Sequence, residues 1–470
     1  MAKKLTRRDF LRISALTAAG AALAACEPTP PEVVEKTVVR EEVPVEQPVV
    51  VTSTPPESEA LTVQYWVAWG QLDRIWEQLE ETDEYAELVK GYEVELRGSV
   101  NTEAVLTAVA AGTPPAGLSN YQYIDFMARG ALRPIDDLVA ISSIVKEEEF
   151  YPPNWGYGFY RGTQYGVPVL EGFLTYGLNY NARLVEEAGL DPDNPPLTWE
   201  GCLDWHRALT KFDGAGNLLQ IGLDPYDAMG SYFGADHGGA FFPLSWGFKW
   251  FDNDARTFNL NNENTVEALD LMGEFYRIAG PDNIGGMRQV EGQGTWGGSF
   301  NTEAQAMIIE GYWHPGETMT EKPEVGVHNR ATWAPVPEGR KGAKLAGTSL
   351  HYVIFPKDGK NSEGMFKIAE FLCTDAAAEI VFNAHGWLPP RPSFLEKVDP
   401  SVYPGLDFYF DAVPQVTDWV VPARCEIMGF VDTQFGVLRE AVYRGEMTAV
   451  EAAEEFQRRC EEEYQAAGFA

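Results

Sequence analysis

The residues with the clearest chemical potential are aromatic side chains that stand beside glycine, proline or polar residues rather than on apolar faces. The chain has 13 Trp, 20 Tyr and 25 Phe. A flat ring beside a carboxylate or an amide suits a sugar, because the C–H face of the sugar stacks on the ring while its hydroxyls form hydrogen bonds at the rim. Each residue alone more often belongs to a core, and only the group favours an aromatic-lined cleft. The group is Trp69, Tyr121, Tyr123, Trp155, Trp246, Trp296, Trp313 and Trp387.

Motifs for catalysis, metals and cofactors are absent or weak. The sequence has no HExxH, Walker A or GxSxG motif. A GxGxxG match at residues 292–297 lacks a convincing preceding strand, which favours a glycine-rich loop over a dinucleotide site. Asp252-Asn253-Asp254 begins like a calcium loop, but Arg256 occupies a ligand position, so a β-turn is favoured. The 6 His residues show no metal spacing, and among 70 carboxylates no pair stands out as a glycosidase dyad. We therefore expect that the protein is not an enzyme and binds neither a metal ion nor a cofactor.

Strand-like and helix-like segments alternate along the chain, which predicts an α/β fold. The first strand is expected at 61–67, where apolar residues alternate weakly. Thr198 is a good N-cap for a helix running towards Lys211, and Thr448 with Glu451 forms a capping box for a C-terminal helix. Further helices are expected at 73–88, 102–111, 264–279, 362–373 and 448–467.

The N-terminal segment is typical of an export signal. Residues 1–25 combine a basic start with a short uncharged apolar stretch, which predicts a signal peptide. Arg7-Arg8 lies in a sequence that resembles a twin-arginine signal, and Leu23 to Cys26 resembles a lipobox. The resemblance implies that Cys26 is lipidated and becomes the first mature residue. Residues 26–59, rich in Pro, Val and Glu, are expected to be a linker.

The composition limits the classes of partner. The 470 residues are too many for one core, and the net charge is −34. Removing residues 1–25 removes five basic side chains and Asp9, which takes the mature chain to about −38. Such acidity disfavours nucleic acid and a polybasic membrane-binding face. Four further cysteines are expected to be buried free thiols, with Cys425 and Cys460 the first pair to test for a disulfide.

A series of motifs in a fixed order resembles extracellular solute-binding protein family 1, the group that includes maltose-binding protein. The resemblance covers about residues 61–467. Two departures are Ala116-Gly117, where Asp-Val is usual, and Glu303-Ala304, where Gly-Lys is common. The motifs are AAGTPP at 110–115, GALRPIDD at 130–137, YGVP at 165–168, LNYN at 178–181, GLDP at 189–192, TW at 198–199, AQAM to GYW at 304–313, PVP at 335–337, AG at 346–347 and GWLPPR at 386–391.

The resemblance implies a class II periplasmic-binding-protein-like fold, with two α/β lobes and a ligand cleft between them. Lobe 1 would comprise 60–172 plus 347–395, and lobe 2 would comprise 173–346 plus 396–470. The hinge crossovers would lie near 171–176, 347 and 394–400. The ligand would stabilise closure, and the closed monomer would dock on an ABC permease at the outer face of the cytoplasmic membrane.

The resemblance also implies ligand-contacting positions. Asp224-Pro225-Tyr226 resembles a Glu-Pro-Tyr motif that contacts sugar, and Phe435 stands where a stacking Trp is found. Trp313 lies between Gly-Tyr and His-Pro-Gly, which predicts a loop and a stacking contact rather than a core residue. The full set is Trp69, Asn120, Tyr121, Glu171, Asp224, Tyr226, Trp313, Trp387 and Phe435.

A carbohydrate is the leading ligand class, although the acid pattern beside the first strand does not reproduce that of a maltose binder. Another polar solute, such as a polyol or glycerol phosphate, is the main alternative. A phosphate would require Arg or Lys in the cleft, and the candidate loops are poor in both. A secreted carbohydrate-active enzyme and a structural surface lipoprotein are the alternatives from other classes.

Overall fold

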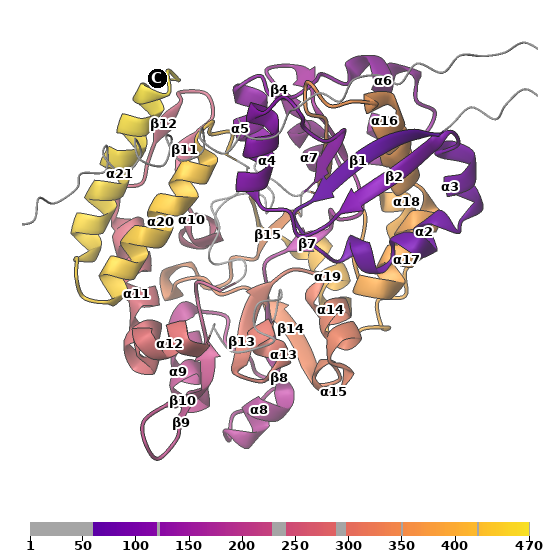
Figure 1. The fold of residues 1–470 in the computed structure, drawn as a ribbon. Helices are drawn as coiled ribbons and strands as arrows, with labels where there is room; N and C mark the ends of the chain where they lie inside the picture. The colour runs from indigo at the N-terminus through magenta and orange to yellow at the C-terminus, as the bar shows by residue number, and fades with distance from the viewer. Residues whose placement is uncertain are drawn as a thin grey trace, which may run out of the picture. The chain divides into compact units, whose positions relative to one another are not determined.

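The strand expected at the start of the body is β1 (Leu61–Val67), which lies inside the first of two five-stranded sheets (Figure 1). The computed structural model describes residues 60–119, 123–227, 241–287, 298–348, 351–420 and 423–469. The predicted signal peptide, Cys26 and the linker lie outside these residues, as do Asn120, Tyr121, Trp296 and the 292–297 loop. No helix of the described residues combines the length and apolar character needed to cross a bilayer.

The first sheet has the order β2-β1-β3-β16-β6. β1 pairs in parallel with β2 (Tyr92–Arg97) and β3 (Gly117–Ser119), while β16 (Tyr352–Ile354) is antiparallel to both β3 and β6 (Gly166–Pro168). Helix α16 (Ser362–Leu372) packs on β1 and on α3 (Asp83–Leu88). The parallel strands end at a common edge, the usual position of ligand sites in open α/β sheets.

The second sheet has the order β14-β8-β13-β10-β9. Its central strand β13 (Gln305–Glu310) is buried along its whole length, as expected for a strand covered on both faces. β13 is parallel to β10 (Leu218–Leu223) and antiparallel to β8 (Gly177–Asn181). The remaining strands are β14 (Asn329–Trp333) and β9 (Lys211–Phe212).

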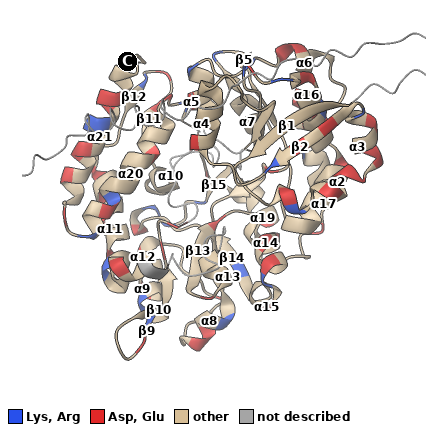
Figure 2. Cartoon of the chain, viewed as in Figure 1, with Lys and Arg blue, Asp and Glu red and all other residues tan. Residues whose placement is uncertain are grey.

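Three long helices pack against one another beside the second sheet. They are α11 (Glu263–Ala279), α20 (Met428–Tyr443) and α21 (Ala449–Ala466). In Figure 1, α20 and α21 are the adjacent yellow helices. Figure 2 shows Asp and Glu spread over the outer helices, α3 and α21 among them, rather than gathered in one place. In this view the acidic residues are therefore not confined to one element.

A small sheet connects the two large ones. It consists of β15 (Leu345–Thr348), paired in parallel with β17 (Asp418–Trp419) and antiparallel with β7 (Leu174–Thr175). The chain leaves the first sheet after β6, passes through β7 and enters the second sheet at β8. It returns through β15 to β16. Residues just after β6 and just before β16 thus lie on connections between the sheets.

The sequence predicts most of the regular elements. Predictions are confirmed for α4 (Thr102–Ala110), α9 (Trp199–Leu209) with Thr198 as N-cap, α11, α16, and α21 with its capping box. The single helix expected at 73–88 is wrong, because Thr82 adopts an extended conformation and caps α3 with its side chain. The segment forms η1 (Leu72–Arg74), α2 (Trp76–Glu80) and α3.

The turn predicted at Asp252 is also confirmed. It connects β11 (Phe251–Asp252) to β12 (Thr257–Phe258), and the Asp252 carboxylate accepts hydrogen bonds from the amides of Asp254 and Ala255. The other elements are α5 (Tyr123–Ala128), α6 (Asp136–Ile141), η2 (Glu147–Glu149), α7 (Pro152–Tyr157), β4 (Phe159–Tyr160), β5 (Thr163–Gln164), α8 (Ala182–Glu187), α10 (Phe241–Trp246), α12 (Pro281–Met287), α13 (Gly298–Asn301), α14 (His314–Glu321), α15 (Pro323–Gly326), η5 (Glu338–Arg340), α17 (Asp375–His385), α18 (Pro392–Leu395), α19 (Leu406–Ala412) and η6 (Val413–Gln415).

The four cysteines of the body are buried free thiols, as predicted. Burial raises the pKa of the Cys373 and Cys425 thiols to about 12. These thiols are therefore protonated at neutral pH and are poor nucleophiles.

Candidate ligand-binding site

Two indoles and an imidazole meet where the chain passes between the sheets. Trp69 follows β1, and its ring centroid lies 5.8 Å from that of Trp387 and 5.9 Å from that of His351, both edge-on. The Trp387 and His351 centroids are 6.3 Å apart. His385 also packs on Trp387, with their ring centroids 5.1 Å apart. Its Nε2 lies 3.2 Å from the Gln71 carbonyl oxygen.

A buried carboxylate faces the imidazole. Val169 N–H donates to the His351 carbonyl at 2.9 Å, which extends the β6–β16 pairing and brings Glu171, two residues further on, beside the His351 side chain. The Glu171 Oε2 and His351 Nδ1 atoms are 3.4 Å apart, without the geometry of a hydrogen bond. Within the described part of the chain, Glu171 Oε2 and both ring nitrogens of His351 lack a hydrogen-bond partner.

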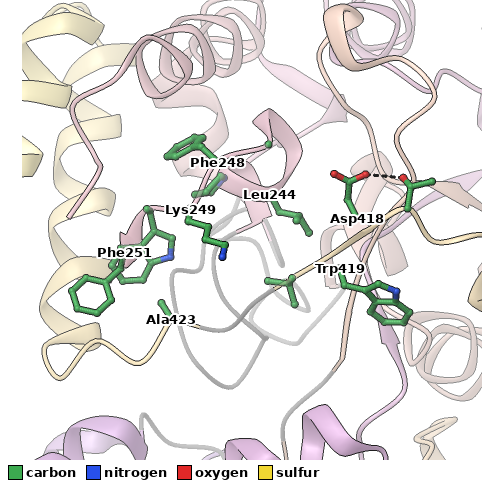
Figure 3. A pocket seen from close by; sticks show the side chains of 12 residues that line it. Leu244, Phe248, Lys249, Phe251, Asp418, Trp419 and Ala423 are labelled. Carbon is green, nitrogen blue, oxygen red and sulfur yellow. Dashed lines mark hydrogen bonds between the residues drawn. The ribbon is translucent and has the colours of Figure 1, made fainter. Parts of the chain in front are cut away.

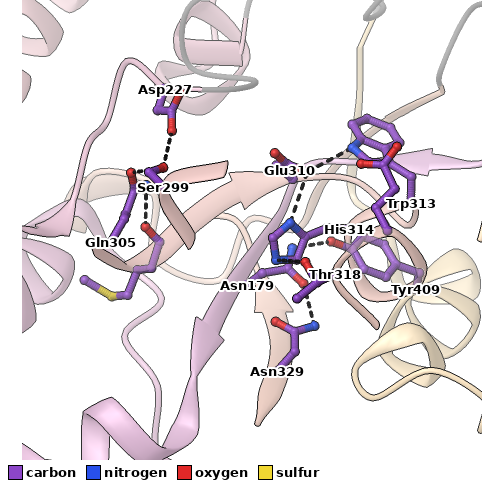
Figure 4. A network of polar contacts seen from close by, with 12 residues as sticks. Asn179, Asp227, Ser299, Gln305, Glu310, Trp313, His314, Thr318, Asn329 and Tyr409 are labelled. Atoms are coloured by element: carbon purple, nitrogen blue, oxygen red, sulfur yellow. Dashed lines mark hydrogen bonds and ion pairs between the residues drawn. The ribbon is translucent and has the colours of Figure 1, made fainter. Parts of the chain in front are cut away.

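A second indole–carboxylate group lies at the end of β13 (Figure 4). The Glu310 Oε2 atom accepts a hydrogen bond from Trp313 Nε1 at 2.9 Å and lies 3.2 Å from His314 Nδ1. Since this oxygen is an acceptor, we assign the proton of His314 to Nδ1, and Nε2 can accept from Thr318 Oγ1 at 3.5 Å. Burial lowers the pKa of His314 to about 3, so the imidazole is neutral.

Glu317, in the first turn of α14, connects the two groups. Trp387 Nε1 donates to Glu317 Oε1 at 2.7 Å. Burial of the carboxyl group, followed by the nearby charge of Glu310, raises the pKa of Glu317 well above its usual value, and Glu171 acts in the same direction. The ends of both sheets thus contribute to one cluster of indoles and carboxyl groups, which we call the Trp–Glu cluster: Trp69, Glu171, Glu310, Trp313, Glu317, His351 and Trp387.

Backbone contacts hold the cluster together. The carbonyl oxygen of Leu388 accepts hydrogen bonds from Gly172 N–H at 2.9 Å and from Tyr312 Oη at 3.0 Å. The backbones of Gly316 and Gly386 touch, because a Cβ added at Gly316 would lie 2.4 Å from the Gly386 Cα. Gly386 also has a φ of +74°, the left-handed conformation that ends α17. Glycine is therefore required on both sides of this contact.

The other predicted site residues form a separate aromatic group beside α11 and α20. Tyr276 Oη donates to the Asp224 carboxylate at 2.5 Å, and the ring centroids of Tyr226 and Tyr276 are 5.5 Å apart. The Phe435 centroid lies 5.7 Å from Tyr226, and the guanidinium of Arg439 lies 4.5 Å from the Tyr226 centroid. Asp224, Tyr226 and Phe435 are all buried. We call these five residues the Tyr226 group.

The predicted residues are thus distributed over two places. Trp69, Glu171 and Trp387 come together, and Trp313 joins them through Glu310 and Glu317. The loop expected around Trp313 is wrong, because His314 begins α14 and Pro315 occupies its first turn, a position that suits proline. Three aromatic residues proposed for the cleft pack in the interior instead: Tyr123 beside Tyr157 and Tyr352, Trp155 on Phe150, and Trp246 on Trp199.

Sequence reasoning missed His351, Glu310 and Glu317. Glu310 and Glu317 stand three residues before and four residues after Trp313, so helical and strand spacing around a predicted Trp could have suggested them. His351 gave no such signal, because its neighbours Glu171 and Trp69 are distant in the sequence. In the described residues, no group of three or more His, Cys, Asp or Glu side chains could hold a metal ion.

A surface pocket of about 320 Å³ lies next to the small connecting sheet (Figure 3). An exposed indole, Trp419, and the amine of Lys249 line it together with Phe248, and Asp418 is held by a hydrogen bond from Arg340 at 2.5 Å. None of the predicted site residues lines this pocket.

Comparison with solved structures defines the class of fold. An ABC-transporter solute-binding protein from Thermotoga lettingae, solved with α-D-tagatose, superposes with a TM-score of 0.69 at 20% identity and covers 85% of this chain and 99% of its own. A substrate-binding protein from Listeria monocytogenes, solved with cycloalternan, gives a TM-score of 0.69 at 17% identity and covers 87% of this chain and all of its own. These likenesses confirm the predicted two-lobed α/β fold.

Sequence comparison identifies the family. Residues 71–379 match the bacterial extracellular solute-binding protein family, and the chain belongs to it. The chain is 31% identical over 293 residues to the sn-glycerol-3-phosphate-binding periplasmic proteins of Escherichia coli K12 and Shigella flexneri serotype 5b. The alignment covers 62% of this chain and 64% of those relatives, so the chain spans less than two thirds of their length.

Proposed function

We propose that this solute-binding protein captures a neutral carbohydrate and delivers it to an ABC permease. The ligand would lie at the Trp–Glu cluster, against the partly buried ring of Trp69 and the rings of Trp313 and Trp387, which this structure buries. The carboxyl groups of Glu171, Glu310 and Glu317 would accept or donate hydrogen bonds to hydroxyls.

The charge of the cluster is the observation that carries the proposal. In the described part of the chain, neither Glu171 nor Glu317 forms an ion pair with Lys or Arg. A phosphate monoester carries about two negative charges and is normally bound by such cations. The carboxyl groups of Glu171 and Glu317 supply no positive charge for such a ligand in either protonation state. The cluster therefore favours a neutral sugar.

The second candidate is sn-glycerol 3-phosphate, because the curated relatives are named for it. The Tyr226 group would suit a phosphate better than the Trp–Glu cluster does, because the Tyr226 group includes the cation Arg439. The same experiment tests both ligands. Thermal unfolding of the purified full-length chain would be measured with mannobiose, mannotriose, α-D-tagatose, ribitol, cycloalternan and sn-glycerol 3-phosphate.

A ligand at 100 times its dissociation constant stabilises the folded protein by about 2.7 kcal/mol, which is readily detected. We expect stabilisation by at least one of the neutral sugars and none by sn-glycerol 3-phosphate, whereas stabilisation by ribitol alone would favour a polyol as the ligand. Stabilisation by the phosphate alone would replace the proposal with the second candidate. Release of reducing ends from a bound oligosaccharide by the purified protein would instead indicate an enzyme.

The remaining predicted ligand contacts are part of the proposal. Asp224, Tyr226 and Phe435 would contact the ligand when the lobes close, together with Asn120 and Tyr121. Lobe 1 would comprise 60–172 plus 347–395, and lobe 2 would comprise 173–346 plus 396–470. Differential affinity for the closed arrangement would shift the population towards it.

The location of the protein is likewise proposed from the sequence. Residues 1–25 would direct export by the twin-arginine route, and lipidated Cys26 would anchor the chain to the outer face of the cytoplasmic membrane. The 26–59 linker would then separate the binding unit from the lipid. The protein would act as a monomer beside its permease.

A further inference from the structure

His351 is an exception among the buried histidines. Its side chain is 1% exposed, yet both ring nitrogens lack a hydrogen-bond partner in the described part of the chain. His206 is equally buried, but its Nε2 lies 3.1 Å from the Phe275 carbonyl oxygen and its Nδ1 accepts from Leu223 N–H at 3.0 Å. Buried polar groups are almost always satisfied, so the difference requires a reason.

The unsatisfied atoms of His351 face another unsatisfied atom. Glu171 is 3% exposed, and its Oε2 lies 3.4 Å from His351 Nδ1 without forming a hydrogen bond. At this distance the two groups are an ion pair only if His351 is protonated, and the hydrogen-bonding capacity of both atoms is unused. Their position beside the Trp69 and Trp387 rings places them in the proposed sugar site.

A hydroxyl group has the hydrogen-bonding capacity that this pair lacks. It can donate its proton to the Glu171 carboxylate and accept a hydrogen bond from an N–H of His351 at the same time. We infer that His351 contacts the ligand and, with Glu171, selects a carbohydrate hydroxyl held against the Trp69 and Trp387 indoles. This inference rests on the proposed function and names a residue that determines specificity.

The selection would be strong because both partners are buried. A site built to bind a hydroxyl rejects the analogue without it, since the buried polar groups are then left unpaired. The two residues also lie on different connections between the sheets, Glu171 after β6 and His351 before β16. A hydroxyl that bridges them would tie these two connections together in the bound state.

The experiment has a ligand-free arm and a ligand arm, both on the full-length chain. In the first, thermal unfolding without ligand is compared for wild type, His351→Phe and the matched control His206→Phe. Phenylalanine at 351 removes unsatisfied polar atoms, so the unfolding midpoint should stay level or rise. Phenylalanine at 206 leaves the Leu223 amide unsatisfied, so the midpoint should fall.

In the ligand arm, calorimetry uses the neutral compound that gives the largest thermal shift among mannobiose, mannotriose, α-D-tagatose, ribitol and cycloalternan. His351→Phe should weaken binding by roughly tenfold or more, a loss of about 1.4 kcal/mol. His351→Asn keeps an N–H donor and should recover part of the affinity, whereas a residue that only packs would gain nothing from the amide.

The outcomes separate this inference from the proposed function. A midpoint for His351→Phe that falls as far as that of His206→Phe would show a structural histidine and overturn the inference. Wild-type affinity in His351→Phe would overturn it as well, while leaving the carbohydrate proposal intact. If no neutral compound shifts wild type, the carbohydrate proposal fails, and the ligand-free arm still decides whether His351 is a structural residue.

Discussion

Substitutions of Trp313 test whether this residue of the Trp–Glu cluster contributes to folding stability, to ligand binding or to both. The side chain is 3% exposed, and its Nε1 donates to Glu310 at 2.9 Å. Replacing it with alanine removes a whole buried indole, which typically costs about 3–5 kcal/mol of folding free energy. Phenylalanine keeps most of the ring but loses the donor, and a hydrogen bond to a charged group contributes about 1.5–3 kcal/mol. His314 remains beside Glu310, so we expect a loss for Trp313→Phe near the lower value.

Affinity should respond differently from stability. If the indole face contacts the sugar, Trp313→Ala loses roughly 1–3 kcal/mol of binding free energy, while Trp313→Phe retains the stacking surface and binds within a few-fold of wild type. Denaturant titration of the ligand-free variants and calorimetry with the neutral sugar found in the thermal screen provide both quantities. A folded Trp313→Ala variant that binds this sugar with wild-type affinity would refute the stacking role and leave only packing.

Three further outcomes are expected. Burial raises the pKa of Asp125 to about 7, above its unfolded value, so the folded state holds this proton more tightly and the contribution of Asp125 to the free energy of unfolding should fall by up to ~4 kcal/mol between pH 4 and 7. Because burial lowers the pKa of His314 and gives the opposite pH dependence, the contribution is read as the difference between wild type and Asp125→Asn in denaturant titrations at each pH, and a difference that does not vary with pH would contradict the assignment. Glu426 accepts hydrogen bonds from Arg256 and from the Tyr464 hydroxyl, so Glu426→Gln should lower the free energy of unfolding by about 3–5 kcal/mol in the same assay. The control Glu462→Gln changes an exposed ion pair and should lower it by less than ~1 kcal/mol. Mass spectrometry of membrane-derived protein should find a lipid on Cys26, and an unmodified N-terminus elsewhere would rule out the anchor.

Local sequence signals predicted local structure well. The alternation in 61–67, the stop at Gly112 and the Thr448–Glu451 capping box all depend on neighbours within a few residues, and each is found in the structure. The error at 73–88 is also local. Thr82 followed by Asp83 is an N-cap signal inside a helical pattern, and the continuous apolar periodicity obscured it.

Residues of the candidate site could be predicted only where they belong to, or stand beside, a family motif. The order of family motifs placed Trp69, Glu171 and Trp387, which the fold brings together. Adjacent glycine or proline was a poor guide for Trp155 and Trp246, because tertiary packing decides burial. His351 could not be found from spacing, since its importance arises from the β6–β16 register and from partners that its nitrogens lack.

The touching backbones of Gly316 and Gly386 have a consequence for engineering. Helix α14 follows β13 of the second sheet, and α17 packs on α14 and on α16, which lies against β1 of the first sheet. The two missing side chains allow α14 and α17 to approach this closely. A single methyl group at Gly316 would act as a wedge, because only 2.4 Å separates its position from the Gly386 Cα. Such a wedge would force the helices apart and strain the hydrogen bond from Trp387 to Glu317, whose residues neighbour the two glycines, without replacing any side chain of the Trp–Glu cluster. If the proposed lobe closure occurs, Gly316 is therefore a position at which its equilibrium could be adjusted by a single substitution.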